Sequence, residues 1–349
     1  MLAPASNDPP SSDIRTASEP REIPVGRLAF VSDSGLSSVY EFDLGRMRFI
    51  GPAPSTTAFG FGRLPADPTT VGHRAPQRGA VVGSTLYLGG GGSGALIVIP
   101  ITPTGLGEPT FVQAPPMTVM FQGRAHPLPD LDVEYAVGTA SGEIVAIGRS
   151  LRLGAVVALI YDPARGAFVK SSQLTDGTPQ IVVASTGGVV VVTNHQIVDT
   201  LDDALSVHHV AELPGIPHGA AVIGATLYVS IEGTPTRLVS LDLKGGSPPT
   251  TIDIAPGKSS GAVATDGSSL VFWAQPAESR VRRIDVSTKQ AADFFVCKNL
   301  TSMAWTGQGS LLATCVAKDE LASFQSDGSG LAATPAGYFP IDVVVEPNA

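Results

Sequence analysis

The sequence predicts an all-β protein, a seven-bladed β-propeller of four-stranded antiparallel blades, and three observations point to this fold. A glycine turn followed by an apolar strand recurs six times along the chain. Glycine and proline account for 39 and 29 of the 349 residues, which is too much punctuation for a helical protein. The chain also ends on an alternating strand pattern, 341–345, which needs a pairing partner elsewhere in the sequence.

The six glycine turns mark six blades. Each turn leads into apolar residues, as in "VVGSTLYLG" (81–89) and "VIGATLYVS" (222–230). Successive marker glycines are 59, 45, 37, 43 and 42 residues apart: Gly83, Gly142, Gly187, Gly224, Gly267 and Gly309. Glycine suits hairpin turns because it adopts positive φ without steric cost. Four-stranded repeats of about 40 residues are typical of propeller blades.

A further alternating strand follows each hairpin, and four of these strands end on an aspartate. We interpret these aspartates as turn formers, because their carboxylates can accept hydrogen bonds from the turn amides that follow: Asp43, Asp162, Asp242 and Asp285.

The N-terminal segment 27–51 supplies three strands of a seventh blade, with no innermost strand before them. The predicted innermost strands begin near residues 217, 259, 299 and 339, so the C-terminal strand has the spacing of an innermost strand. We therefore predict that the C-terminal strand joins the N-terminal blade and closes the ring.

Residues 25–349 are expected to form this single domain. Residues 1–24 form a Pro- and Ser-rich leader that is too poor in apolar side chains to fold. The leader lacks the apolar centre of a signal peptide, so it is either an ordinary start or the remainder of a trimmed export signal. We expect a periplasmic, cell-surface or secreted protein, or a cytoplasmic one if Met1 is the native start.

Charge and hydropathy exclude some partners. The formal net charge is -9, whereas nucleic acids and anionic membranes select basic surfaces. No apolar run reaches the roughly 18 residues of a membrane-spanning helix. The "GKS" within 256–261 lacks the first glycine of a phosphate-binding loop, and "GGGGSG" (89–94) fits a loose hairpin loop.

Two segments, "TDGSSLVFWA" (265–274) and "FPIDVVVEP" (339–347), resemble bacterial seven-bladed propellers of the YVTN and lactonase-like superfamily. The repeat pattern extends this resemblance over residues 27–347. It implies the fold but no activity, because propellers host many functions. For lactonase-like members it also implies a divalent ion held by Glu, Asn and Asp at the channel mouth. Asn194 and Asn299 fall near that mouth, but no matching Glu is identified, so we predict no resident cofactor, with a divalent metal as the alternative.

Four histidines fall on one face of the predicted ring, where the connections between blades and the loops between second and third strands emerge. If they converge, they could bind a transition metal; otherwise they are separate loop residues: His73, His126, His195 and His218.

The same face carries three enlarged loops, 52–77, 114–132 and 149–155. Long loops inside a compact domain are commonly functional, so we predict a recognition surface for a protein or small ligand. The alternative is a lid over the channel. The predicted binding residues are aromatic and arginine side chains of these loops: Phe59, Phe61, Phe121, Arg124 and Arg152.

Cys297 and Cys315 are the two cysteines of the chain. Both strands that carry them are predicted to end near the loop-rich face, so a disulfide is feasible and would indicate an oxidising compartment. Two separate buried thiols are the alternative.

Three functions remain open from the sequence. The first is a non-enzymatic binding or scaffold protein that uses the loop-rich face. The second is a metal-assisted hydrolase or lyase of the lactonase-like kind, and the third is a structural subunit of a larger assembly.

Overall fold

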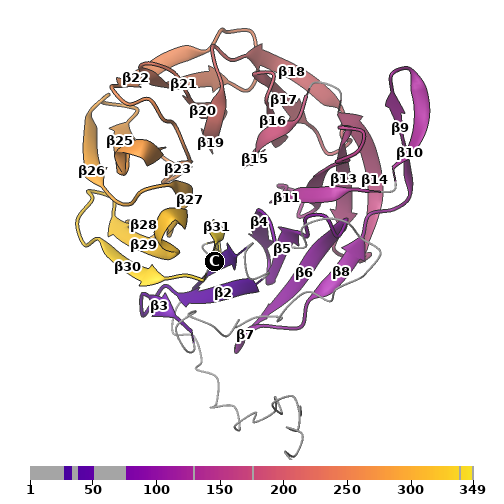
Figure 1. The fold of residues 1–349 in the computed structure, drawn as a ribbon, viewed down its shortest axis with the longest axis horizontal. Coiled ribbons are helices and arrows are strands. Elements are labelled where there is room, and N and C mark those ends of the chain that lie inside the picture. The colour runs from indigo at the N-terminus through magenta and orange to yellow at the C-terminus, as the bar shows by residue number, and fades with distance from the viewer. Residues whose placement is uncertain are drawn as a thin grey trace, which may run out of the picture.

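The computed structural model describes residues 27–33, 38–50, 76–128, 130–174, 177–337 and 339–347. These residues form seven antiparallel blades around one central axis, which confirms the predicted seven-bladed propeller (Figure 1). The innermost strand of each blade lines the axis and the fourth strand forms the rim. In the described part of the chain, no helix is long and apolar enough to cross a membrane.

The first three blades, each given from the axis outward, have the following strands: β31 (Pro340–Val345), β1 (Leu28–Asp33), β2 (Ser38–Asp43) and β3 (Arg48–Phe49); β4 (Gly79–Val82), β5 (Thr85–Gly89), β6 (Ala95–Thr102) and β8 (Thr110–Gln113), with the short β7 (Gly105–Leu106) beside β6; β11 (Asp132–Gly138), β12 (Ile144–Arg149), β13 (Val156–Asp162) and β14 (Ala167–Leu174).

The other four blades repeat this order: β15 (Pro179–Ser185), β16 (Gly188–Thr193), β17 (Ile197–Leu201) and β18 (Val207–Glu212); β19 (Pro217–Ile223), β20 (Thr226–Ile231), β21 (Thr236–Asp242) and β22 (Thr250–Ala255); β23 (Val263–Thr265), β24 (Leu270–Gln275), β25 (Arg280–Asp285) and β26 (Ala291–Phe295); β27 (Leu300–Trp305), β28 (Ser310–Cys315), β29 (Glu320–Gln325) and β30 (Ala332–Pro335).

The C-terminal strand closes the ring, as the sequence predicts. β31 pairs antiparallel with β1, with Val343 opposite Val31, and becomes the innermost strand of blade one. Arg27 clamps this end of the chain: its guanidinium donates to the Glu346 carbonyl (2.6 Å) and to the Thr306 carbonyl. Both ends of the domain therefore contribute to the same blade.

The core is divided among the seven interfaces between neighbouring blades, each with its own cluster of buried apolar side chains. A blade therefore buries both of its faces, and its middle strands need no polar alternation. The run Val189–Val192 in β16 is buried at every position. This packing accounts for the continuous apolar stretches of the sequence.

The predicted turn chemistry is confirmed at the four aspartates. The Asp43 carboxylate accepts the Gly45 amide (2.8 Å), and each of the other three accepts an amide two residues further on: Asp162, Asp242 and Asp285. One glycine marker is displaced, because the positive φ of the blade-four turn belongs to Gly188 (127°) instead of Gly187.

Two segments differ from their predicted loop structure. Within 114–132, β9 (Met117–Phe121) and β10 (Arg124–Leu128) form a hairpin outside the ring beside β14, closed by positive φ at Gln122 and Gly123 (Figure 1). The glycine-rich segment 89–94 is also no loose loop. Gly91 exchanges backbone hydrogen bonds with Val133 of blade three (3.0 and 3.1 Å).

The predicted leader, 1–24, and residues 52–75 of the first enlarged loop lie outside the described residues. The boundary of the domain at residue 25 therefore stays a prediction.

Candidate functional site

One face of the ring, here called the loop face, carries the connections between blades and the loops between second and third strands. An open cavity of about 680 Å³ lies on it between blades two and three. Four short segments line it: 92–94 before β6, 113–117 from the end of β8 to the start of β9, 128 and 130–132 at the entry to blade three, and 151–152 between β12 and β13. Two of the three loops predicted from the sequence thus contribute to one cavity.

The floor of the cavity is apolar and continuous with the core. Leu128 and Leu131 are buried in the cluster between blades two and three, and Met117 packs against the same cluster. Leu151 stands at the lip with 56% of its surface exposed. A volume of several hundred Å³ with apolar walls and a few polar groups is typical of sites for small ligands.

Asp130 holds the lip in place. Its carboxylate accepts hydrogen bonds from the Ser150 hydroxyl (3.0 Å) and from the Arg152 amide (3.2 Å). The Ser150 hydroxyl oxygen in turn accepts the Leu153 amide (3.1 Å). On the opposite wall, the glycine segment is fixed to blade three by Gly91. The cavity is therefore bounded by loops with defined backbone contacts.

Of the predicted binding residues, Arg152 lines this cavity. Phe121 and Arg124 lie at the tip of the hairpin, are paired across its turn, and do not line the cavity. Phe121 is half-buried against the His126 ring (centroids 6.0 Å apart), whereas Arg124 is exposed. Phe59 and Phe61 lie outside the described residues.

Besides the burial of Val119 and Leu128 in the core cluster between blades two and three, a side chain of β14 hydrogen-bonds to the hairpin. The Gln173 amide of β14 accepts the Met120 N–H (2.7 Å) and donates to the Met120 carbonyl (2.8 Å). No sequence pattern indicates this contact, because a glutamine on an outer strand is ordinary.

Large apolar side chains are exposed around the loop face. Six of the ten found among the described residues lie on hairpin β9–β10, on loops of this face or at the strand ends that reach it: Met120, Leu151, Ile216, Ile254, Phe295 and Phe339. Single exposed apolar residues are normal on a protein surface, but their concentration on one face is typical of an interaction surface.

The channel mouth on the loop face has a second recurring feature. In five blades the innermost strand contains a bulge that leaves one residue without a partner opposite it: Ile341, Glu134, Gln180, His218 and Thr301. Bulges re-aim side chains and are frequent beside functional sites. The sequence pattern did not reveal them.

Two of the bulged residues pair with a side chain at the end of the neighbouring strand. Glu134 binds Arg149 (2.7 Å), and His218 Nε2 lies 2.6 Å from a carboxylate oxygen of Glu232. Both members of the His218 pair are partly exposed.

The predicted histidines occupy different blades. His126 lies on β10, His195 follows β16 in blade four, and His218 lies on β19 in blade five. His73 is outside the described residues, so a site shared by all four stays a prediction.

The lactonase-like resemblance implies a divalent ion, and the described residues do not assemble its donor set. Among them, no group of three or more His, Cys, Asp or Glu residues could hold a metal ion. Glu134 and Glu232 are paired as described, and the Asn194 side-chain oxygen accepts the Thr178 amide (2.8 Å). We therefore derive no chemistry through a metal.

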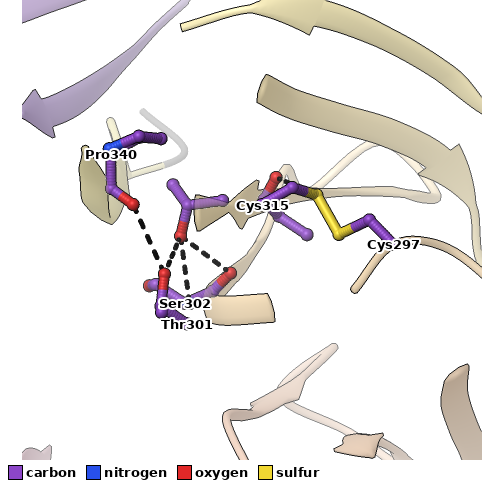
Figure 2. Close-up of a disulfide and its surroundings, with 7 residues drawn as sticks. Cys297, Thr301, Ser302, Cys315 and Pro340 are labelled. Carbon is purple, nitrogen blue, oxygen red and sulfur yellow. Dashed lines mark hydrogen bonds between the residues drawn. A yellow bond between two sulfur atoms is a disulfide. The ribbon is translucent and has the colours of Figure 1, made fainter. Parts of the chain in front are cut away.

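Cys297 and Cys315 form a disulfide with Cα atoms 6.0 Å apart (Figure 2). Both residues are buried, and the bond ties the connection that leaves blade six to the second strand of blade seven. Close by, the Thr301 hydroxyl lies 2.9 Å from that of Thr314, whose oxygen also accepts the Ser302 amide (3.0 Å).

Comparisons with known proteins show a likeness of fold and no likeness of sequence. No protein-family model matches the sequence, and no curated protein sequence matches it either. Among solved structures, a functionally unknown protein from Desulfotomaculum acetoxidans superposes with a TM-score of 0.63 at 13% identity, over 93% of this chain and 100% of that one.

Streptogramin B lyase gives a TM-score of 0.60 at 11% identity, over 77% of this chain and 86% of that one. A chain of a nidogen/laminin complex gives 0.53 at 8%, over 75% and 98%. The likeness is one of fold. It confirms the propeller resemblance stated from the sequence and leaves the activity open.

Proposed function

We propose that this protein is a non-enzymatic binding propeller that holds a ligand in the cavity between blades two and three. The cavity itself is the observation that carries the proposal. Loops that add residues to the regular blade repeat build it, and its floor is apolar. Loops on a rigid scaffold commonly carry recognition, and the exposed apolar side chains on the same face support it.

We place the protein outside the cytoplasm. The buried disulfide supports this, because such bonds persist in oxidising compartments and are rare in the cytosol.

Ligand capture from native extract tests the binding proposal. The immobilised protein should retain small molecules that mass spectrometry identifies, and Leu151→Ser at the lip should lose them, because the variant removes an apolar wall of the cavity. Leu331→Ser is the matched control, since Leu331 is also exposed (42%) but precedes β30 on the opposite face. Equal retention by both variants would contradict the proposal.

A second candidate, a lyase or hydrolase, rests on His218 and Glu232 at the channel mouth. When the proton of a neutral His218 is on Nε2, this N–H donates a hydrogen bond to the Glu232 carboxylate. Nδ1 then holds a lone pair and can act as a general base. One fold neighbour is named a streptogramin B lyase, which makes a streptogramin B the first substrate to test. Turnover that disappears in His218→Asn would support this candidate, and no turnover by the parent protein would remove it.

A further inference from the structure

The cavity between blades two and three has a polar side in addition to its apolar floor. Asp130 and Asp132 line it from the segment that enters β11, and both side chains are partly buried. The hydrogen-bond partners of the Asp130 carboxylate are a hydroxyl and a backbone amide, which are neutral donors and leave its negative charge in place.

The cation of the same cavity, Arg152, is placed differently. Its side chain is exposed at the rim, where water and salt screen the guanidinium charge. The Asp130 carboxylate is less exposed, and a charge acts more strongly where less water surrounds it. The inner part of the cavity therefore favours a positive group on a ligand.

The apolar surface decides what must accompany that positive group. Met117, Leu128 and Leu151 line the cavity beside the carboxylates, and Pro115 and Pro116 line it as well. A bare ion would leave this surface in contact with water, whereas an apolar body would cover it.

From these features we propose that the cavity binds an apolar molecule that carries a protonated amine. The amine lies against the carboxylate of Asp130, and the apolar body covers the leucine, methionine and proline surface. This inference rests on the proposed binding function and names the chemical class of its ligand.

Three indoles of similar size and different charge test the inference: tryptamine, neutral tryptophol and anionic indole-3-acetate, titrated calorimetrically at pH 7 in low salt. Tryptamine should bind about tenfold tighter than tryptophol, and indole-3-acetate should bind weakest. Asp130→Asn should reduce the preference for tryptamine over tryptophol. Asp203→Asn, an exposed position before β18, should leave it unchanged.

Two outcomes overturn the inference. If tryptophol binds as tightly as tryptamine, the cavity is a ligand site without a charge preference, and the binding function stands while the amine class fails. If none of the three indoles binds, the amine class also fails. The binding function itself is judged separately, by whether Leu151→Ser and Leu331→Ser differ in the ligands that they capture from extract.

Discussion

Asp342 shows how a single side chain joins three blades. It lies on the closing strand β31, accepts the Ser302 hydroxyl of blade seven (2.7 Å) and accepts the Gly79 amide of blade two (3.2 Å). Burial raises the pKa of this carboxyl, and the nearby Arg78 guanidinium and these two hydrogen bonds only partly offset the effect.

The sign of this shift predicts a pH dependence. A carboxyl with a raised pKa binds its proton more tightly in the folded state, so its contribution to stability is complete below the ordinary carboxyl pKa of about 4 and is lost as pH rises through the folded value. Asp342→Asn removes the titration. The free energy of unfolding of the parent, minus that of the variant, should therefore fall as the pH rises above about 4 in urea titrations. Parallel pH profiles would contradict this account, and Asp203→Asn serves as the exposed control.

The disulfide should contribute to stability through the unfolded chain. Cys297 and Cys315 are 18 residues apart, and closing a loop of this length is worth about 3 kcal/mol in the chain-entropy model. The double variant Cys297→Ser/Cys315→Ser should lose about that amount in denaturant unfolding. Thiol titration of denatured, unreduced parent protein should find no free thiol; two free thiols would show that the bond is absent in solution.

At the scale of an element, the β9–β10 hairpin depends on Gln173 for its attachment to β14. Gln173→Ala removes two hydrogen bonds to Met120. Since each is worth about 0.5–1.5 kcal/mol, amides of residues 117–128 should exchange with deuterium about tenfold faster, while the melting temperature stays nearly unchanged. The control is Gln290→Ala, an exposed glutamine in the loop before β26. Unchanged exchange in the hairpin would mean that core packing of Val119 and Leu128 holds it alone.

The elements that could be predicted from the sequence are those that follow local rules. Glycine turns, aspartate turns and apolar strands depend on neighbouring residues, and these gave the blade order and the terminal closure. The bulge at His218 and the Gly91–Val133 bridge depend on how strands from different parts of the chain meet. The hairpin was missed because its alternation, Met117 to Phe121, follows two prolines that indicate a loop.

The candidate site was predicted only in part, for the same reason. The enlarged loops 114–132 and 149–155 stand out against the repeat length, so the sequence singles them out as candidate site loops. The cavity that they share arises from the packing of blade two against blade three. Asp130 and Asp132 belong to no sequence motif, and their place on the cavity wall is visible only in the structure.

At the scale of the whole molecule, β31 closes the ring. Deleting residues 338–349 removes the innermost strand of blade one, the Asp342 contacts with blades two and seven, and the Glu346 contacts with Arg27 and Leu28. The exposed edge of β1 would then offer unpaired backbone groups to other chains.

The truncated protein should therefore unfold or aggregate, as seen by size-exclusion chromatography and circular dichroism. Deletion of 348–349 alone, which leaves β31 complete, should behave like the parent. A synthetic peptide of residues 338–349 should restore a monomer, because it can supply the missing strand to β1. If the 338–349 deletion stays monomeric and melts at the parent's temperature without the peptide, closure by β31 does not hold the ring together.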